Sequence, residues 1–130
     1  MSRFAGLTRS EVAEFFDEQK DQLNLVTMLE FLSTAEAILR LDFETRVAAR
    51  KKDSLSRRYR QIESDRDKVR LDEDLLDAMA EEGVNVSDFR GALRLRHWLA
   101  HGRYWAPKLG QSYTPQVVFD ISKSLIDSIP

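Results

Sequence analysis

The chain has 130 residues, of which 42% are hydrophobic and 32% charged, a balance typical of one globular domain and unlike that of a disordered chain. It contains no cysteine, which excludes disulfide scaffolds, thiolate metal sites and cysteine nucleophiles, and its five glycines and three prolines are too few turn residues for an all-β fold. No apolar run reaches the ~18 residues of a membrane span, and the start lacks the apolar core of a secretory signal. We therefore expect a cytoplasmic protein without membrane contact.

Hydrophobic spacing predicts helices from the beginning of the chain. Thr8 and Glu11 fit a capping box at the start of a first helix over about 9–19. The segment 21–50 has neither glycine nor proline, and its apolar residues exceed one helical stripe, as in a central helix or a subunit interface. A break at Asp53–Ser54 then leads to a basic helix over about 54–68.

Three further helices are expected in the second half of the chain. A short helix over 71–82 ends at Gly83, and Ser87 has the character of an N-cap for a helix over about 88–101. Thr114 and Pro115 fit the N-cap and first position of a last helix over about 116–128. The sequence thus predicts an all-α fold: an up-and-down bundle of about five to six helices forming one domain over residues 1–130.

The charge is distributed unevenly. The net charge is only −2, but residues 46–70 contain ten bases and four acids and so carry +6. Such a stretch can contact nucleic-acid phosphates, and it can equally be a solvated helix face with alternating charges. Tyr59 is the one aromatic residue of this stretch. A nucleic-acid binder built on the stretch alone would therefore lack the aromatic rings on which bases stack.

The segment 93–105 holds both histidines and both tryptophans. Arg96 is a permanent cation suited to phosphate, and His101 can exchange protons near neutral pH, which together suffice for phosphoryl chemistry without a metal. Five residues apart on an ideal helix, the two side chains point about 140° apart, so they converge only where the helix ends, as Gly102 permits. In the purely structural interpretation, His101 caps the helix and Arg96 pairs with an acid such as Glu36.

The string Arg96-His97-Trp98-Leu99-Ala100-His101-Gly102 resembles the motif of the HEPN superfamily: arginine, a polar residue, three further residues and histidine. The resemblance implies a HEPN-like helical homodimer that cleaves RNA without metal or cofactor, often as a toxin or defence component with an antitoxin or other protein partner. It gives His101 the role of general base or acid, Arg96 that of neutralising the phosphorus, and His97 that of orienting its neighbours. The expected products are a 2′,3′-cyclic phosphate and a 5′-hydroxyl.

Other residues are expected to support this site. Glu36 and Arg40 are an i,i+4 pair that can stand behind it, as can Tyr104. In HepT-type toxins a tyrosine follows the histidine by two places, where this chain has Arg103, so we do not assign it to that type. The cations expected to hold the RNA backbone are Arg50, Lys51, Lys52, Arg57, Arg58 and Arg103.

Two other interpretations remain open from the sequence. The same helices can form a non-catalytic interaction or regulatory module of a defence or signalling assembly, with the arginine and histidine purely structural. His97 and His101 also have the i,i+4 spacing of a zinc-binding pair, but no third ligand stands near them, and no metal site is predicted.

Overall fold

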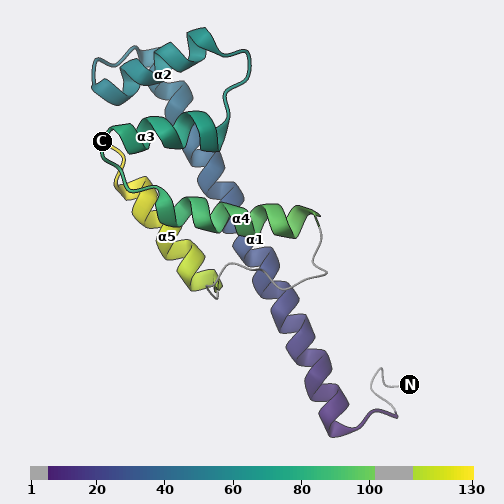
Figure 1. The fold of residues 1–130 in the computed structure, drawn as a ribbon. Coiled ribbons are helices and arrows are strands. Elements are labelled where there is room, and N and C mark those ends of the chain that lie inside the picture. Colours follow the sequence, from purple (N-terminus) through teal and green to yellow (C-terminus); the bar gives the residue numbers. More distant parts are fainter. Residues whose placement is uncertain (1–5, 102–112) are drawn as a thin grey trace.

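A computed structural model describes the backbone of residues 6–101 and 113–130 and the side chains of all of these except 98–101. Every regular element within the described ranges is helical, which confirms the all-α prediction (Figure 1). No helix in those ranges combines the length and apolar composition needed to cross a bilayer. The elements are α1 (Arg9–Ala49), α2 (Ser54–Asp65), the π-helix η1 (Leu71–Leu76), α3 (Asp77–Glu81), α4 (Ser87–His101) and α5 (Pro115–Asp127).

One 41-residue helix, α1, replaces the two helices expected over 9–19 and 21–50. The predicted break was wrong because the polar residues 17–22 include no glycine or proline, and most are good helix formers. Its start was predicted correctly: the Thr8 hydroxyl accepts the Glu11 backbone N–H at 3.1 Å and donates to the Glu11 carboxylate at 3.1 Å. The first third of α1 projects beyond the other helices (Figure 1).

The predicted break at Asp53–Ser54 is confirmed. Arg50 takes the left-handed conformation with φ of 51°, which ends α1. Asp53 caps α2 by accepting the Ser56 backbone N–H at 3.1 Å. Helix α2 ends at Asp65, three residues before the expected end, and the chain then bends at residues 67 and 68 before η1 begins.

The helix expected over 71–82 consists of two pieces, η1 and α3. The Arg70 carbonyl accepts both the Asp74 and the Leu75 backbone N–H at 3.2 Å, which widens the first turns into a π-helix. Gly83 ends α3 with φ of 88°, as expected of a C-terminal glycine.

The caps of the last two long helices differ in how well the sequence predicts them. Helix α4 begins at Ser87, so Ser87 is its first helical residue and not the N-cap expected from the sequence, and its hydroxyl donates to the Asn85 side chain at 2.7 Å. Asn85 also accepts the Ser87 backbone N–H at 3.2 Å. At α5, Thr114 is the N-cap, as expected, and accepts the Val117 backbone N–H at 3.2 Å.

The core lies around the C-terminal two thirds of α1. Helix α5 runs beside α1, and α4 crosses it near the middle, so α4 does not simply run up or down the bundle axis (Figure 1). The Phe43 and Tyr59 rings meet edge to face at 5.1 Å and join α1 to α2. The most deeply buried side chains come from all six helical elements and include Leu32, Leu39, Leu55, Tyr59, Leu75, Leu76, Met79, Phe89 and Val118.

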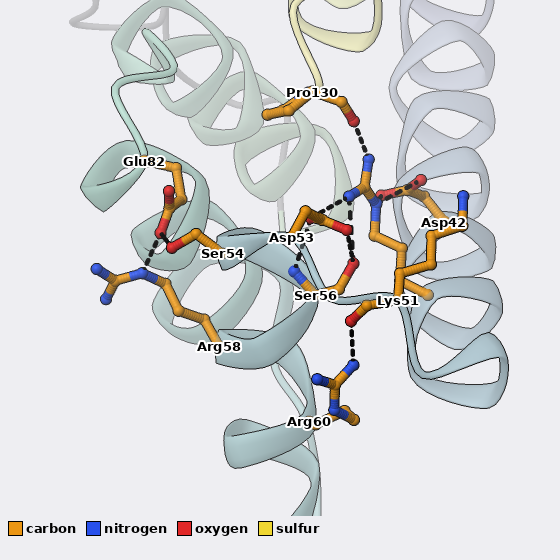
Figure 2. A network of polar contacts seen from close by, with 10 residues as sticks. Asp42, Lys51, Asp53, Ser54, Ser56, Arg58, Arg60, Glu82 and Pro130 are labelled. Carbon is orange, nitrogen blue, oxygen red and sulfur yellow. Dashed lines mark hydrogen bonds and ion pairs between the residues drawn. The ribbon is translucent and has the colours of Figure 1, made fainter.

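A buried cation, Arg46, ties α1 to α2 and to the end of α5. Its guanidinium donates to Asp42 at 2.9 Å and to Asp53 at 2.9 Å, and it also contacts Ser56 and the carbonyl of Pro130. Asp42, Asp53, Ser56 and Pro130 converge on it in Figure 2. The charge of Arg46 is therefore neutralised inside the fold, so this residue does not add to the basic surface expected from residues 46–70.

Candidate functional site

A groove of about 710 Å³ lies where α4, α1 and the segment before η1 meet. Because cationic residues dominate its lining, we call it the basic groove. It contains six cationic and two acidic residues, so its formal charge is +4 without the histidine. Its charged and polar lining residues are Glu36, Arg40, Lys68, Arg70, Asp72, Arg90, Arg94, Arg96 and His97.

One face of α4 forms the first wall of the basic groove. Arg90, Arg94 and His97 are spaced i, i+4, i+7, which places them in one row along a helix. Leu95, on the opposite side, is buried in the core and fixes the rotation of the helix. Burial of the apolar side of α4 therefore turns the cationic side toward solvent.

Glu36 lines the basic groove and joins two arginines. Its Oε1 accepts a hydrogen bond from Nη1 of Arg96 at 2.7 Å, and its Oε2 lies 3.7 Å from Nε of Arg40. The Arg96 side chain keeps 37% of its surface exposed in this contact, and the remaining N–H groups of its fork are suited to a phosphate. Glu36 thus holds Arg96 without burying it.

Residues 68–72 form the second wall of the basic groove, and two arginines hold this wall in place. Arg40 donates to the Val69 carbonyl at 3.1 Å, which fixes the segment after α2 against α1. Arg90 binds Asp72 at 2.9 Å and also contacts Asp77, which fixes η1 and α3 against α4. These contacts stabilise the shape of the basic groove, so both arginines are already engaged.

Lys68 and Arg94 are the cations most available to a ligand. Both are exposed, and neither forms an ion pair with any residue in the described ranges. Arg70 is also exposed and pairs with Glu73 at 3.1 Å across two solvent-facing side chains, a contact that costs little to break. An extended polyanion therefore meets three accessible charges, Arg94 on the α4 wall and Lys68 and Arg70 on the opposite wall.

The structure brings together four of the residues singled out in the sequence. Arg96 and His97 of the motif line the basic groove with Glu36 and Arg40. The predicted i,i+4 pairing of Glu36 with Arg40 is present, and so is the structural contact between Arg96 and Glu36. His101 is the last described residue of α4, and its side chain, like Arg103 and Tyr104, lies outside the described part of the chain.

The other cations expected to bind RNA lie elsewhere. Arg50, Lys51 and Lys52 are at the turn between α1 and α2, and Arg57 and Arg58 are on α2; none lines the basic groove. Arg58 is engaged by Glu81 and Glu82. Hydrogen bonds donated by Ser54 and Arg58 lower the pKa of the Glu82 carboxyl below its usual value.

Sequence reasoning missed Arg90 and Arg94 as groove residues and did not separate Lys68 and Arg70 from the rest of the basic stretch. The row of Arg90, Arg94 and His97 at helical spacing was the available signal. In the described ranges, no group of three histidine, aspartate or glutamate residues is arranged to hold a metal ion. Comparisons with protein-family models, curated proteins and solved structures found no match to this chain.

Proposed function

We propose that this protein is a metal-independent endoribonuclease of the HEPN type, with single-stranded RNA bound in the basic groove. One observation carries the proposal: Arg96 and His97, two residues of the motif, line a groove of formal charge +4. A charged groove of this kind attracts a polyanion whatever its sequence. The resemblance to HEPN proteins then supplies the reaction, the dimeric state and a biological setting in a toxin–antitoxin or other defence system.

The proposed reaction is an internal transfer at phosphorus. The 2′-hydroxyl loses its proton and attacks the adjacent phosphorus, and the bond to the 5′-oxygen breaks as that oxygen gains a proton. His101 serves as the general base or the general acid, because imidazole exchanges protons near neutral pH. Arg96 stabilises the negative charge that builds up on the phosphoryl oxygens, and DNA is inert because it lacks the 2′-hydroxyl.

We propose supporting roles for other residues of the basic groove. Glu36 positions Arg96 through the 2.7 Å contact, and His97 orients the phosphate beside it. Lys68, Arg70 and Arg94 bind the RNA backbone at neighbouring phosphates. In this proposal the RNA lies in the basic groove, whereas the sequence predicted contacts at the turn at 50–52 and on α2.

A second function is a non-catalytic interaction or regulatory module. It is favoured by the same contact, because an arginine held by a glutamate on another helix is a common way to fix two helices together. In that case the basic groove binds an acidic segment of a partner protein, and replacing Arg96 weakens the fold.

RNA cleavage with EDTA present separates the two functions. We expect the wild-type chain to cut a single-stranded RNA and leave the matching DNA intact, and the products to carry 2′,3′-cyclic phosphates. His101→Ala and Arg96→Ala should each abolish cleavage and leave the circular dichroism spectrum and the oligomeric size unchanged. Arg57→Ala is the matched control, since it removes an exposed arginine outside the basic groove.

Each alternative outcome has a defined meaning. If both variants lose their helical signal, the motif is structural and the interaction module is correct. If the wild type binds RNA and never cleaves it, the groove is a binding site without catalysis. If it neither binds nor cleaves RNA, the proposal is wrong as a whole.

A further inference from the structure

A second groove, of about 260 Å³, lies between α1 and α5. We call it the apolar groove, because aliphatic and aromatic side chains make up most of its lining. In both helices the lining residues are spaced i, i+3, i+4, i+7, which is one face of an α-helix. They are Phe31, Thr34, Ala35 and Ile38 of α1 and Phe119, Ser122, Lys123 and Ile126 of α5, and none of these eight lines the basic groove.

Small side chains create the space between the two helices. Ala35 and Ser122 are 2% and 6% exposed, so these two residues form the floor of the apolar groove. The Phe31 and Phe119 rings meet edge to face at one end, with their centroids 5.5 Å apart. The groove therefore has a floor without bulky groups and an aromatic end.

The apolar groove is long enough for an aromatic ring and a short substituent. Helices α1 and α5 run in the same direction (Figure 1), so Ile38 and Ile126, seven positions after the two rings, mark the other end. Seven residues of helix rise about 10 Å. An apolar cavity of about 150 Å³ is known to hold benzene, so the larger volume of this groove admits a ring that carries a polar substituent.

The floor of the apolar groove contains a polar group without a partner. The Ser122 hydroxyl is buried and makes no hydrogen bond within the described part of the chain. Burying a hydroxyl in this way is unfavourable, and native proteins leave few such groups unsatisfied. A ligand atom that accepts a hydrogen bond from Ser122 would remove that cost, so the floor favours a ligand with an acceptor next to its apolar part.

Lys123 is the one charged residue that lines the apolar groove, and its charge favours an anion. Its ammonium is paired with Asp127 at 2.5 Å, but the two side chains are 62% and 60% exposed. An ion pair this exposed contributes little to stability, so the ammonium is free to turn to another carboxylate. Because Ser122 and Lys123 both line the groove, their hydroxyl and ammonium can bind the two oxygens of one carboxylate.

We propose that the apolar groove binds an aromatic monocarboxylate of about the size of phenylacetate or indoleacetate. The ring of the ligand packs against Phe31 and Phe119, since aromatic rings favour edge-to-face contact. Its carboxylate accepts hydrogen bonds from Ser122 and Lys123, which are strengthened by the charges. The inference depends on the groove between α1 and α5 alone and stands whether or not the protein cleaves RNA.

Calorimetric titration of the full-length chain without RNA tests the proposal, with phenylacetate as the probe. Phenylacetate should bind at one site per chain, and phenylacetamide, which lacks the charge, and acetate, which lacks the ring, should each bind at least tenfold more weakly. Nuclear Overhauser contacts between the ligand ring and the methyl groups of Ile38 and Ile126 should place it in the apolar groove. Absence of binding, equal binding of the amide, or ring contacts only at the basic groove overturns the proposal.

Two variants test the hydroxyl of Ser122 and also guard against misfolding. Ser122→Ala should weaken phenylacetate binding about fivefold or more. Without ligand it should unfold at a higher urea concentration than the wild type, because a buried hydroxyl without a partner is gone. Ser124→Ala is the matched control, since it makes the same change at an exposed position of α5 and should raise the urea midpoint less. If Ser122→Ala lowers the midpoint, the hydroxyl is satisfied within the protein and the proposal is wrong.

Two further variants test the charge of Lys123. Asp127→Asn removes the carboxylate that now pairs with this lysine, so it should tighten phenylacetate binding and leave phenylacetamide binding unchanged. Lys123→Gln should weaken phenylacetate binding at least fivefold, while Lys52→Gln, at an exposed lysine outside the apolar groove, should not change it. Equal effects of the two lysine substitutions would show that the anion binds through the overall charge of the protein and not in the apolar groove.

Discussion

Glu36 of α1 accepts a hydrogen bond from Arg96 of α4 at 2.7 Å, across 60 positions of sequence. The contact holds the first residue of the HEPN-like motif in the lining of the basic groove. It has two possible consequences: it either prepares Arg96 for a phosphate or only fastens two helices. The rate of cleavage and the stability of the fold report on these separately.

Replacing Glu36 with glutamine should slow RNA cleavage about tenfold, equivalent to about 1.4 kcal/mol of transition-state stabilisation, because Arg96 is then held less firmly. RNA binding should be unchanged or tighter, since the groove loses a negative charge. Stability should fall by less than about 1 kcal/mol, because both side chains are partly exposed. Single-turnover cleavage, RNA titration and urea unfolding measure the three quantities. A large loss of stability with no change in cleavage rate contradicts a positioning role.

The basic groove also predicts which cations bind RNA. Lys68→Ala and Arg94→Ala should each weaken RNA binding and reduce the slope of log K against log salt by about 0.7, the value for one phosphate contact of a single strand. Lys52→Ala and Arg57→Ala, outside the groove, should leave that slope unchanged. Titrations over a range of salt concentrations decide between the groove and the basic turn. If the slope changes only for Lys52→Ala and Arg57→Ala, RNA binds at the site expected from the sequence and not in the basic groove.

How far the sequence could predict these features depends on the range of the contacts involved. The caps at Thr8 and Thr114 were predicted from the sequence because each residue bonds to a backbone group three positions away. At Asp53 the sequence predicted only the break, although its cap has the same short range. The π-helical start of the helix after Arg70 was not, because apolar periodicity does not distinguish one hydrogen-bond register from the next. Nor can spacing along the chain show that Glu36 meets Arg96, or that Arg46 turns inward while Arg57 faces solvent. Those outcomes depend on how α4 and α2 pack against α1.

Arg46 is a buried cation whose loss should be costly. Arg46→Met removes the donor to Asp42 and Asp53, and we expect a loss of about 2–3 kcal/mol. This is below the cost of stranding a fully buried charge, because the two carboxylates keep 27% and 40% of their side-chain surface exposed and can be hydrated. Urea unfolding measures the change. Arg57→Met, an exposed arginine on α2, should shift stability by no more than about 0.5 kcal/mol. Equal effects of the two substitutions would contradict the structural role of Arg46.

The same network makes the fold sensitive to acid. The hydrogen bond from Ser56, at 2.7 Å to Oδ1, lowers the pKa of Asp53, with further help from the charge of Arg46. A carboxyl whose pKa is lower in the folded state stabilises the fold fully above its unfolded pKa, about 4, and that contribution is lost as the pH falls through the folded value. Unfolding free energy should therefore decrease as the pH drops below about 4. Ser56→Ala removes the main cause of the shift, so this variant should be less stable at neutral pH and should lose less stability on acidification. Urea unfolding of the wild type and Ser56→Ala at pH 7 and at about pH 3, below the unfolded pKa of the carboxyl, makes the comparison. Parallel losses in both proteins would show that other carboxylates, such as Glu82, dominate the acid response.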